Sequence, residues 1–341
     1  MHRRAPVSAA HLRGRALQAP EFRVDEVVAD GDVRAVSQLR WGRLGLPARA
    51  AHGHFACLGA TGSGKTILQR LLMQSMLPEI GSGLGNRALV YDAKQDVLSI
   101  LRGMRLRCPV RLFHPMDARA AAWDMAKDIT APNAALQMAA MLIPQSSKDT
   151  NPFFSNAARH LLFGVLLTFI RRAPGVWTFR QVLLAVRDAP VLRLVLSQEE
   201  ATRHLLQYFE HEGTFQNIVS TILTCTAPYE TIAACWDRAS DGFSLRSWMA
   251  EESILVLGND EANRVAVDTL NRLVFQRLTE LVLGLPELTT AGRGQTWFFL
   301  DEVREMGRLD GLSRLLTKGR SKGAAVVLGL QDVCGLRDVY G

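Results

Sequence analysis

The sequence of 341 residues predicts an α/β fold, in which a mostly parallel β-sheet is covered by helices and carries an all-α insert. Three observations predict it. Short, continuous apolar runs recur between helical patterns, as the buried strands of a parallel sheet do. A glycine-rich loop joins the first of these runs to a helix. Residues 128–237 then show one helical pattern after another, with almost no strand pattern between them.

The glycine-rich loop has the spacing G-x-x-x-x-G-K-[S/T] of a phosphate-binding loop. The apolar run 54–58 before it reads as a buried strand, and apolar residues recur at helical spacing over 67–77 after it. Glycines let the backbone take positive φ and approach a polyphosphate, and the helix N-terminus adds a positive dipole end. A glycine-rich turn without a ligand is the alternative. The predicted nucleotide-binding residues are Gly59, Ala60, Thr61, Gly62, Ser63, Gly64, Lys65 and Thr66.

Two side chains of this loop have specific expected roles. Lys65 should reach the β- and γ-phosphates of a bound nucleotide. The hydroxyl group of Thr66 should be a ligand of Mg²⁺. The loop therefore predicts a magnesium nucleotide as the ligand of this chain.

Further strands are expected at apolar runs on both sides of the helical stretch. These runs are 87–92, 110–114, 253–257, 296–300 and 324–330, and a long helix is expected over 261–283. Polar residues at the carboxyl ends of such strands point into the crevice where α/β folds bind ligands. Asp92 and Lys94 are therefore candidates for the nucleotide site, with an ordinary charged surface loop as the alternative.

The run 296–300 ends in two adjacent acids, Asp301 and Glu302, which is the form of a second nucleotide motif. Asp301 is expected to hold Mg²⁺ directly or through water. Glu302 is expected to polarise the attacking water beside a γ-phosphate. The alternative is an acidic helix N-terminus that follows a strand.

Two residues near the end of the chain are further catalytic candidates. Arg320 follows a helix and precedes a strand, where an arginine can stabilise charge on a transferring phosphoryl group, especially across a subunit boundary. Gln331 ends the last strand, where it could sense the γ-phosphate. A basic helix end that satisfies the helix dipole is the alternative for Arg320.

The helical patterns divide the chain into three parts. They lie over 133–141, 154–171, 178–187, 199–209 and 214–236. We expect an N-terminal basic segment over 1–50, a nucleotide-binding domain made of 51–127 and 238–341, and an all-α insert over 128–237.

Composition and charge limit the class of protein. The formal net charge of +7 and the isoelectric point near 9.5 are compatible with a polyanionic partner. The five cysteines form no C-x-x-C pair or zinc spacing, which favours buried thiols in a reducing compartment. The longest apolar run, 161–170, is about half of what a bilayer crossing needs, and the N-terminus lacks the apolar segment of a secretory signal. We therefore expect no transmembrane helix, and we expect the chain to be cytoplasmic.

Taken together, these residues resemble the conjugative coupling proteins of type IV secretion systems, the TraD/TrwB type, within the wider group of hexameric P-loop DNA translocases. The resemblance covers nearly the whole chain. It is carried by the segments 54–66, 92–94, 151–154, 243–248, 299–302, 318–320 and 329–331, and by the closing residues to 341.

This resemblance implies a RecA-like ATPase domain that binds ATP and Mg²⁺, with an all-α domain facing the cytoplasm. It implies a ring of six subunits whose channel passes DNA without reading its sequence, and in which Arg320 reaches a neighbour's ATP. Relaxosome and secretion-channel proteins are the implied partners. Family members begin with a membrane-spanning region and continue with further core strands. Neither is found here, so membrane contact, at the cytoplasmic face of the bacterial inner membrane, is expected only through a region absent from this chain.

Two alternative functions are compatible with the same residues. The chain could be a docking receptor that recruits a DNA–protein complex through the helical insert, with ATP as a structural or switching ligand. It could also be a P-loop ATPase that drives protein transfer rather than DNA transfer.

Overall fold

The computed structural model describes residues 39–340, apart from 43, 47, 146–151 and 289–292. Most of the predicted N-terminal segment 1–50 lies outside the described residues, as do Asn151 and Gly341 from the runs that carry the family resemblance. Within that segment, β1 (Leu39–Trp41) and β2 (Leu44–Leu46) form an antiparallel pair, and η2 (Ala48–His52) follows them.

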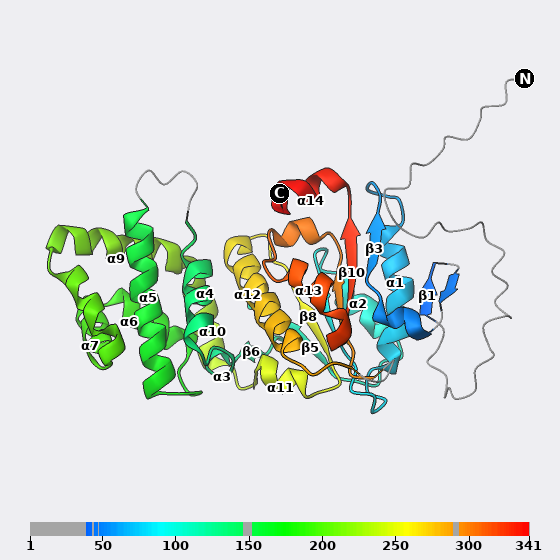
Figure 1. Cartoon of the computed structure of the whole chain (residues 1–341), viewed down its shortest axis with the longest axis horizontal. Helices are drawn as coiled ribbons and strands as arrows, with labels where there is room; N and C mark the ends of the chain where they lie inside the picture. The colour runs from blue at the N-terminus through cyan, green and yellow to red at the C-terminus, as the bar shows by residue number, and fades with distance from the viewer. Residues whose placement is uncertain (1–38, 43, 47, 146–151, 289–292, 341) are drawn as a thin grey trace, which may run out of the picture. The chain divides into compact units, whose positions relative to one another are not determined.

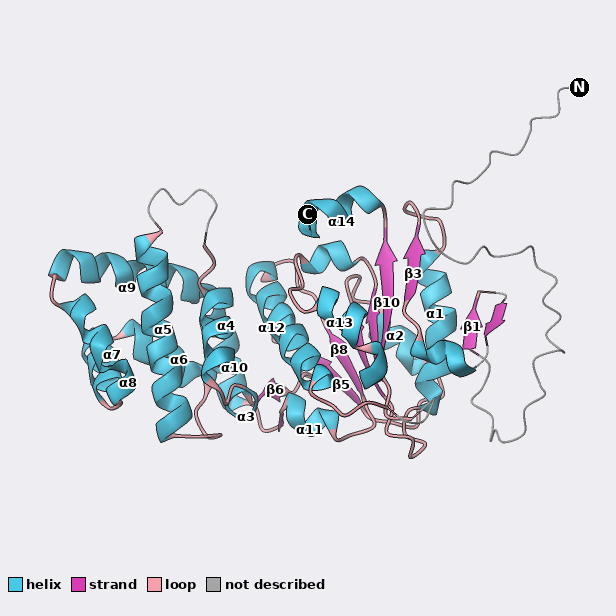
Figure 2. Ribbon diagram, viewed as in Figure 1, coloured by secondary structure: helices cyan, strands magenta, loops and turns pink. Residues whose placement is uncertain are grey.

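Six parallel strands form the central sheet, as the apolar runs predict (Figures 1 and 2). In spatial order they are β3 (Phe55–Leu58), β10 (Ala324–Leu330), β9 (Thr296–Leu300), β4 (Arg87–Tyr91), β8 (Ile254–Leu257) and β5 (Val110–Phe113). Each begins and ends within one residue of its predicted run. Leu58 pairs with Leu330 and Tyr91 pairs with Leu300, so the loops that follow these strands meet at one edge of the sheet.

Helices cover both faces of this sheet because successive strand side chains point in opposite directions. Val90 and Phe299 pack on one face with α1 (Lys65–Met76) and α2 (Val97–Arg102). Leu89 and Phe298 pack on the other face with α12 (Arg264–Leu283) and α13 (Leu312–Lys318). Burial on both faces explains why the strands read as continuous apolar runs. Shorter elements around the sheet are η3 (Leu77–Glu79), α11 (Leu245–Met249), η6 (Val303–Met306), η7 (Arg320–Lys322) and α14 (Val333–Tyr340).

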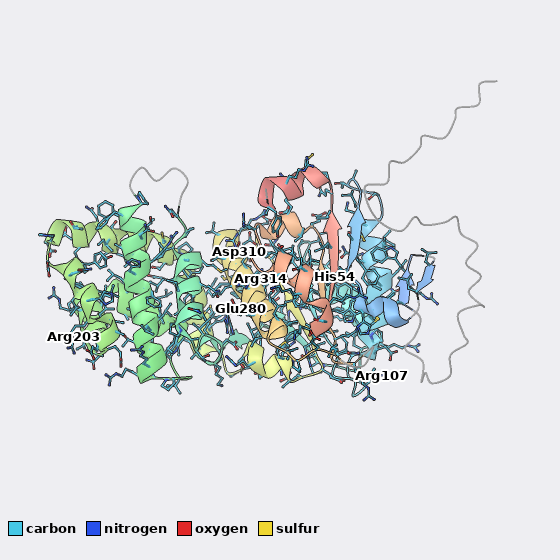
Figure 3. The ribbon with its side chains drawn as sticks, in the orientation of Figure 1. His54, Arg107, Arg203, Glu280, Asp310 and Arg314 are labelled. Carbon is cyan, nitrogen blue, oxygen red and sulfur yellow. The ribbon has the colours of Figure 1, made fainter. Side chains whose placement is uncertain are left out.

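His54, labelled in Figure 3, ties the start of β3 to its neighbours. Its Nδ1 accepts the backbone N–H of Val326 in β10 at 3.2 Å, and its Nε2 lies 3.0 Å from the carbonyl oxygen of Leu316 in α13. The ring is therefore neutral, with its proton on Nε2. Burial lowers the pKa of His54, and the positive charge of Arg320 lowers it further against the opposing hydrogen bond to Leu316.

Between β6 (Ala122–Trp123) and β7 (Gly242–Phe243) every described element is a helix. The chain passes through α3 (Met125–Asp128), α4 (Pro132–Leu142), α5 (Phe153–Arg172), α6 (Phe179–Arg187), α7 (Ala189–Ser197), α8 (Glu200–Arg203), η4 (His204–Phe209), α9 (Glu212–Thr226), η5 (Ala227–Tyr229) and α10 (Glu230–Arg238). β6 and β7 pair in parallel, which brings the two ends of this stretch together. The domain division at residues 128 and 237 remains a prediction.

Three details of this helical stretch differ from the predicted pattern. The single helix expected over 214–236 is two helices, because Pro228 in η5 interrupts the hydrogen-bond ladder. The pattern over 199–209 is divided between α8 and η4. Helix α7 was not predicted, although Asp188 caps it by accepting the N–H of Val191 at 2.9 Å.

Asp128 links the helical stretch to α11 and α12. Its fully buried carboxylate accepts the indole N–H of Trp123 at 2.6 Å and the backbone N–H groups of Leu245 and Arg246 at 2.7 and 3.0 Å. Burial raises the pKa of Asp128, and these three donors oppose that effect. Arg277 of α12 donates to the backbone carbonyl of the same residue at 2.9 Å. One residue thus connects β6, α11 and α12.

Within the described part of the chain, two helical stretches are long and apolar enough to cross a bilayer by length and composition, namely 153–172 and 212–238. The apolar run 161–170 is thus part of a 20-residue helix, and its length alone does not exclude a membrane span. In α5, however, 56% of the apolar window is buried inside the protein, where this helix packs against α4, α6, α7 and α9. This packing is that of a core helix.

Candidate functional site

The loop 59–66 lies between β3 and α1, as its pattern predicts. Gly62 and Gly64 have φ of 80° and 88°, in the left-handed region that glycine adopts without strain. Lys65 is the first residue of α1 and is buried. Its ammonium group donates hydrogen bonds to the carbonyl oxygens of Gly59 and Ala60, the second at 3.0 Å. The positive charge is therefore held against the loop backbone that a phosphate would approach.

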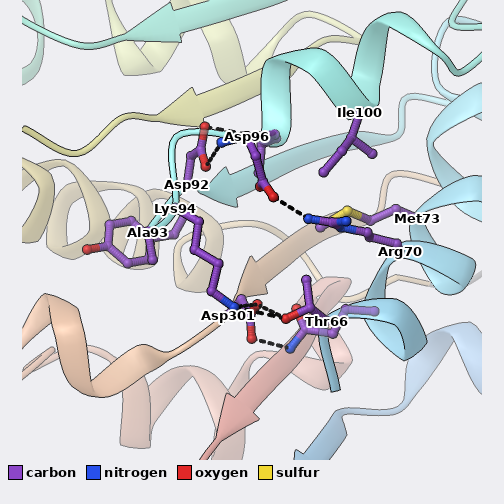
Figure 4. Close-up of a pocket in the computed structure, with 12 residues that line it drawn as sticks. Thr66, Arg70, Met73, Asp92, Ala93, Lys94, Asp96, Ile100 and Asp301 are labelled. Atoms are coloured by element: carbon purple, nitrogen blue, oxygen red, sulfur yellow. Dashed lines mark hydrogen bonds and ion pairs between the residues drawn. The ribbon is translucent and has the colours of Figure 1, made fainter. Parts of the chain in front are cut away.

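The two predicted nucleotide motifs meet at the edge of the sheet (Figure 4). The hydroxyl of Thr66 donates a hydrogen bond to Oδ2 of Asp301 at 2.8 Å, although 235 residues separate the two positions. Thr66 lies in the first turn of α1, and Asp301 directly follows β9. The parallel sheet brings them together because β3, β10 and β9 are consecutive in it.

Glu302 and Gln331 lie beside this pair. Glu302 has φ of 51°, an uncommon conformation for a residue with a side chain, which costs of order 1 kcal/mol and is typical of functional sites. The Nε2 of Gln331 donates to Oε1 of Glu302 at 3.4 Å. Gln331 follows β10, so two neighbouring strand ends supply these side chains.

Lys94 belongs to the same cluster, whereas Asp92 holds the start of α2 beside it. The ammonium of Lys94 lies 3.2 Å from Oγ1 of Thr66, 3.4 Å from Oε1 of Glu302 and 3.9 Å from Oδ2 of Asp301. Asp92 is buried, and its carboxylate accepts the backbone N–H groups at the start of α2, which are those of Asp96 and Val97 (Figure 4). Burial raises the pKa of Asp92, and these N–H groups oppose the shift.

Sequence reasoning missed two residues that position Asp301. Gln69 is buried on α1 and donates to Oδ1 of Asp301 at 3.4 Å. Its place three residues after Thr66 puts it on the same helix face, a pattern that could have indicated it. Gly329 of β10 lies so close that a Cβ there would stand 2.3 Å from Oδ1 of Asp301. Only glycine leaves that space, and the linear sequence does not reveal the close approach.

Arg320 is the one predicted site residue that the described fold does not bring to this cluster. It is exposed in η7, before β10, whereas the loop 59–66 and Asp301 lie beyond the carboxyl ends of their strands. The length of β10, seven residues or roughly 20 Å at about 3.3 Å per residue, lies between the two edges. Arg320 therefore lies at the opposite edge of the sheet from the phosphate loop of its own chain.

An open groove of about 490 Å³ borders the loop on the side of β3, which is an edge strand of the sheet. Its lining includes Trp41, Lys65, Leu58 and Ile67. Leu58 and Ile67 are 58% and 63% exposed, so two large apolar side chains lie open to solvent beside the loop. This edge offers apolar surface for a ligand or a neighbouring molecule.

The donor set at the site suits magnesium bound together with a phosphate. Among the described residues, no group of three or more His, Cys, Asp or Glu side chains could hold a metal ion. Thr66 and Asp301 supply hydroxyl and carboxylate oxygens, the hard ligands that Mg²⁺ uses when phosphates and water provide the remainder. The residues therefore fit a magnesium nucleotide better than a metal held by protein ligands alone.

The model of the type IV secretion-system coupling protein DNA-binding domain matches residues 38–341. The chain belongs to this family. The coupling protein TraD of Escherichia coli (strain K12) is 23% identical over 312 residues, which make up 89% of this chain and 41% of TraD. The chain thus spans less than half the length of this curated relative.

Solved structures of the coupling protein TrwB have the same fold as this chain. The unbound monoclinic form of TrwBdeltaN70 has a TM-score of 0.67 at 24% identity and covers 91% of this chain and 69% of that chain. TrwB in complex with ADP and Mg²⁺ has a TM-score of 0.68 at 24% identity. The match covers 89% of this chain and 70% of that TrwB chain. The RecA-like P-loop fold and the TraD/TrwB-type family predicted from the sequence are confirmed.

Proposed function

We propose that this coupling-protein chain is an ATP-driven DNA motor domain of a conjugative type IV secretion system. It binds ATP with Mg²⁺ at the loop 59–66 and hydrolyses it between the subunits of a ring. The observation that carries this proposal is the contact of 2.8 Å between Thr66 and Asp301, which joins the two nucleotide motifs in one site. TrwB structures in complex with non-hydrolysable analogues of ATP and of GTP support a nucleoside triphosphate as the ligand.

Each residue of the cluster has a part in this chemistry. The backbone of the loop and the ammonium of Lys65 bind the phosphates, since Lys65 can exchange its carbonyl partners for phosphate oxygens. Thr66 and Asp301 hold Mg²⁺, which when bound offsets the negative charge of the β- and γ-phosphates. Glu302 orients the attacking water and accepts its proton. Gln331, hydrogen-bonded to Glu302 at 3.4 Å, reports whether a γ-phosphate is present.

The remaining parts of the proposal concern assembly. Arg320 lies at the opposite edge of the sheet from its own loop, so its role requires a neighbouring subunit, and a homo-hexameric ring supplies one. The exposed Leu58 and Ile67 beside the loop are apolar surface that such a neighbour would cover. The net charge of +7 suits sequence-independent contact with DNA phosphates. Relaxosome and secretion-channel proteins are the proposed partners, at the cytoplasmic face of the inner membrane.

Steady-state ATP hydrolysis with and without single-stranded DNA tests the proposal. The wild type should hydrolyse ATP faster with DNA. Lys65→Ala should lose nucleotide binding, and Glu302→Gln should keep it while turnover falls about 10²- to 10⁴-fold, the usual contribution of a general base. Lys127→Ala is the matched control, because this exposed lysine of α3 forms an ion pair with the nearby Asp124 and lies outside the nucleotide cluster.

The alternatives predict different results in the same assay. Nucleotide binding without turnover in the wild type would identify a docking receptor. Turnover that DNA does not change would favour an ATPase of protein transfer. Unchanged nucleotide binding in Lys65→Ala would contradict the site itself.

A further inference from the structure

Lys94 brings a second cation to the oxygens that the proposed function assigns to magnesium and to the attacking water. Its ammonium lies 3.2 Å from the hydroxyl of Thr66, 3.4 Å from the carboxylate of Glu302 and 3.9 Å from that of Asp301. The side chain comes from the turn after β4 and extends to Thr66 and Asp301 (Figure 4). Lys65 contacts loop carbonyls instead, so the two lysines do not share partners.

The turn that carries Lys94 is held in place on both sides. Asp92 accepts the N–H groups of Asp96 and Val97 at 3.0 and 3.2 Å, which fixes the residues that follow the lysine. Gln95 has φ of 58°, and its side chain donates to the carbonyl oxygen of Asn259 at 3.0 Å. The side-chain amide of Asn259 donates in return to the carbonyl oxygen of Ala93 at 3.4 Å.

This support distinguishes Lys94 from a surface lysine that meets a carboxylate by chance. A non-glycine residue at positive φ is a local cost that the surrounding structure must impose, and such positions cluster at functional sites. Here the strained Gln95 is the residue next to Lys94, and its hydrogen bond to Asn259 keeps the turn in that conformation. The side chain of Lys94 itself is 45% exposed, so it can leave the cluster without opening the protein core.

We propose that Lys94 is a tethered cation that occupies the place of the metal between Thr66, Asp301 and Glu302 until a nucleotide binds. An ammonium group and a divalent cation within a few ångströms of each other repel, so both cannot use these oxygens at once. The site therefore has low affinity for a divalent cation alone. Phosphate oxygens add ligands and negative charge, and together they shift the balance toward the metal.

This inference rests on the proposed function, because it concerns the metal site of that function. It adds an order to the binding events: the divalent cation enters with the nucleotide and not before it. It also gives Lys94 a role distinct from that of Lys65, whose partners are the loop and the phosphates. Lys94 is a positioning residue for the carboxylates of Asp301 and Glu302 before the metal enters.

Binding of Mn²⁺, measured by electron paramagnetic resonance without nucleotide, tests the inference. Lys94→Met keeps an unbranched side chain of similar length and removes its charge. This variant should bind Mn²⁺ about tenfold more tightly than the wild type, within the usual range of coupling between sites. Lys94→Gln should show the same gain, and Lys94→Arg should resemble the wild type. Lys127→Met, a change of an exposed lysine paired with Asp124, should leave Mn²⁺ affinity unchanged.

Two further measurements assign the gain to this site. Adding Asp301→Asn to Lys94→Met should remove it, because Asp301 is the carboxylate ligand in question. Mn²⁺ titrations in the presence of ADP should bring the wild type and Lys94→Met closer together, since the nucleotide already displaces the ammonium. Thermal unfolding of each variant shows that its fold is retained.

The outcomes separate the two proposals. If Lys94→Met and Lys94→Gln bind Mn²⁺ no more tightly than the wild type, Lys94 is not a competitor of the metal and the inference is wrong. The proposed function stands in that case as long as the wild type binds Mn²⁺ with ADP. Failure of the wild type to bind Mn²⁺ even with ADP overturns both.

Discussion

Cys57 lies in β3, directly before the phosphate loop, and its reactivity reports on that part of the site. It is buried, and burial raises the pKa of its thiol to about 11, with Asp301 adding to the shift and Lys65 opposing it. Only the thiolate reacts with alkylating agents, and at pH 8 about one thiol in a thousand is then ionised. Iodoacetamide should therefore modify the exposed Cys235 and Cys334 of the native protein and leave Cys57 unmodified.

Mass spectrometry of the digested protein measures this difference. Alkylation of the unfolded protein is the control, since all three cysteines should then react. Modification of Cys57 at the rate of Cys235 in the native protein would mean that β3 opens readily, contrary to its place in the sheet.

At the scale of residues, the sequence predicts those whose role follows from linear spacing. Lys65, Thr66, Asp301 and Glu302 stand in two short motifs, and Thr66 and Asp301 do contact each other. Gly329 could not be predicted in this way, because its importance depends on which strand lies next to β9. Lys94 was a candidate by its place after a strand, but its three partners come from α1 and from the end of β9.

At the scale of elements, His54 couples β3, β10 and α13 in a way that depends on pH. Its Nδ1 must be unprotonated to accept the N–H of Val326, and its pKa is lowered from the ordinary histidine value of 6.5. A depressed histidine pKa means that the stabilisation is complete above pH 6.5 and is lost as the pH falls below that value. Lowering the pH from about 7.5 to about 5.5 should therefore reduce the melting temperature less in His54→Gln than in the wild type.

The difference between variant and wild type is the quantity to compare, because His52 also has a lowered pKa and contributes to the same decline. His211→Gln, at an exposed position, is the control and should follow the wild type. An identical pH dependence of the melting temperature in His54→Gln would show that the ring is not required to be neutral.

The sequence predicts a helix or strand where the element is long enough to show one clear hydrophobic pattern. The six sheet strands are confirmed within one residue, because burial on both faces makes them continuous apolar runs. The short strands β6 and β7 have two residues each, too few for any periodicity. Helix α7 could have been found from Asp188 and Pro190, an N-cap followed by a proline in the first turn, which is a recognised helix start.

At the scale of the whole molecule, the parallel sheet separates the site from Arg320. Every strand of the central sheet runs in the same direction, so residues before a strand and residues after it lie at opposite edges. Within one chain Arg320 cannot act on a nucleotide held by Lys65. In a ring with head-to-tail contacts, one subunit's Arg320 edge can face the next subunit's loop.

Mixing two inactive variants distinguishes these arrangements. Arg320→Ala and Lys65→Ala should each hydrolyse ATP at least about 10³-fold more slowly than the wild type, the usual effect of losing an arginine finger. A mixture of the two should recover activity, because an intact Lys65 from one variant can meet an intact Arg320 from the other. With equal amounts, independent head-to-tail interfaces give about a quarter of the wild-type rate.

The matched control is a mixture of Lys65→Ala with Glu302→Gln, whose two changes fall in the same site of one subunit. Lys94 links Glu302 to Thr66 within one chain, at 3.4 and 3.2 Å, so every site of this mixture carries one of the two defects and none can recover. Recovery in both mixtures would mean that the activity does not come from pairing Lys65 of one subunit with Arg320 of another. Recovery in neither would mean that Arg320 does not act across a subunit boundary. Recovery in the first mixture alone requires Arg320 and Lys65 to come from different subunits, which is what the direction of the sheet demands.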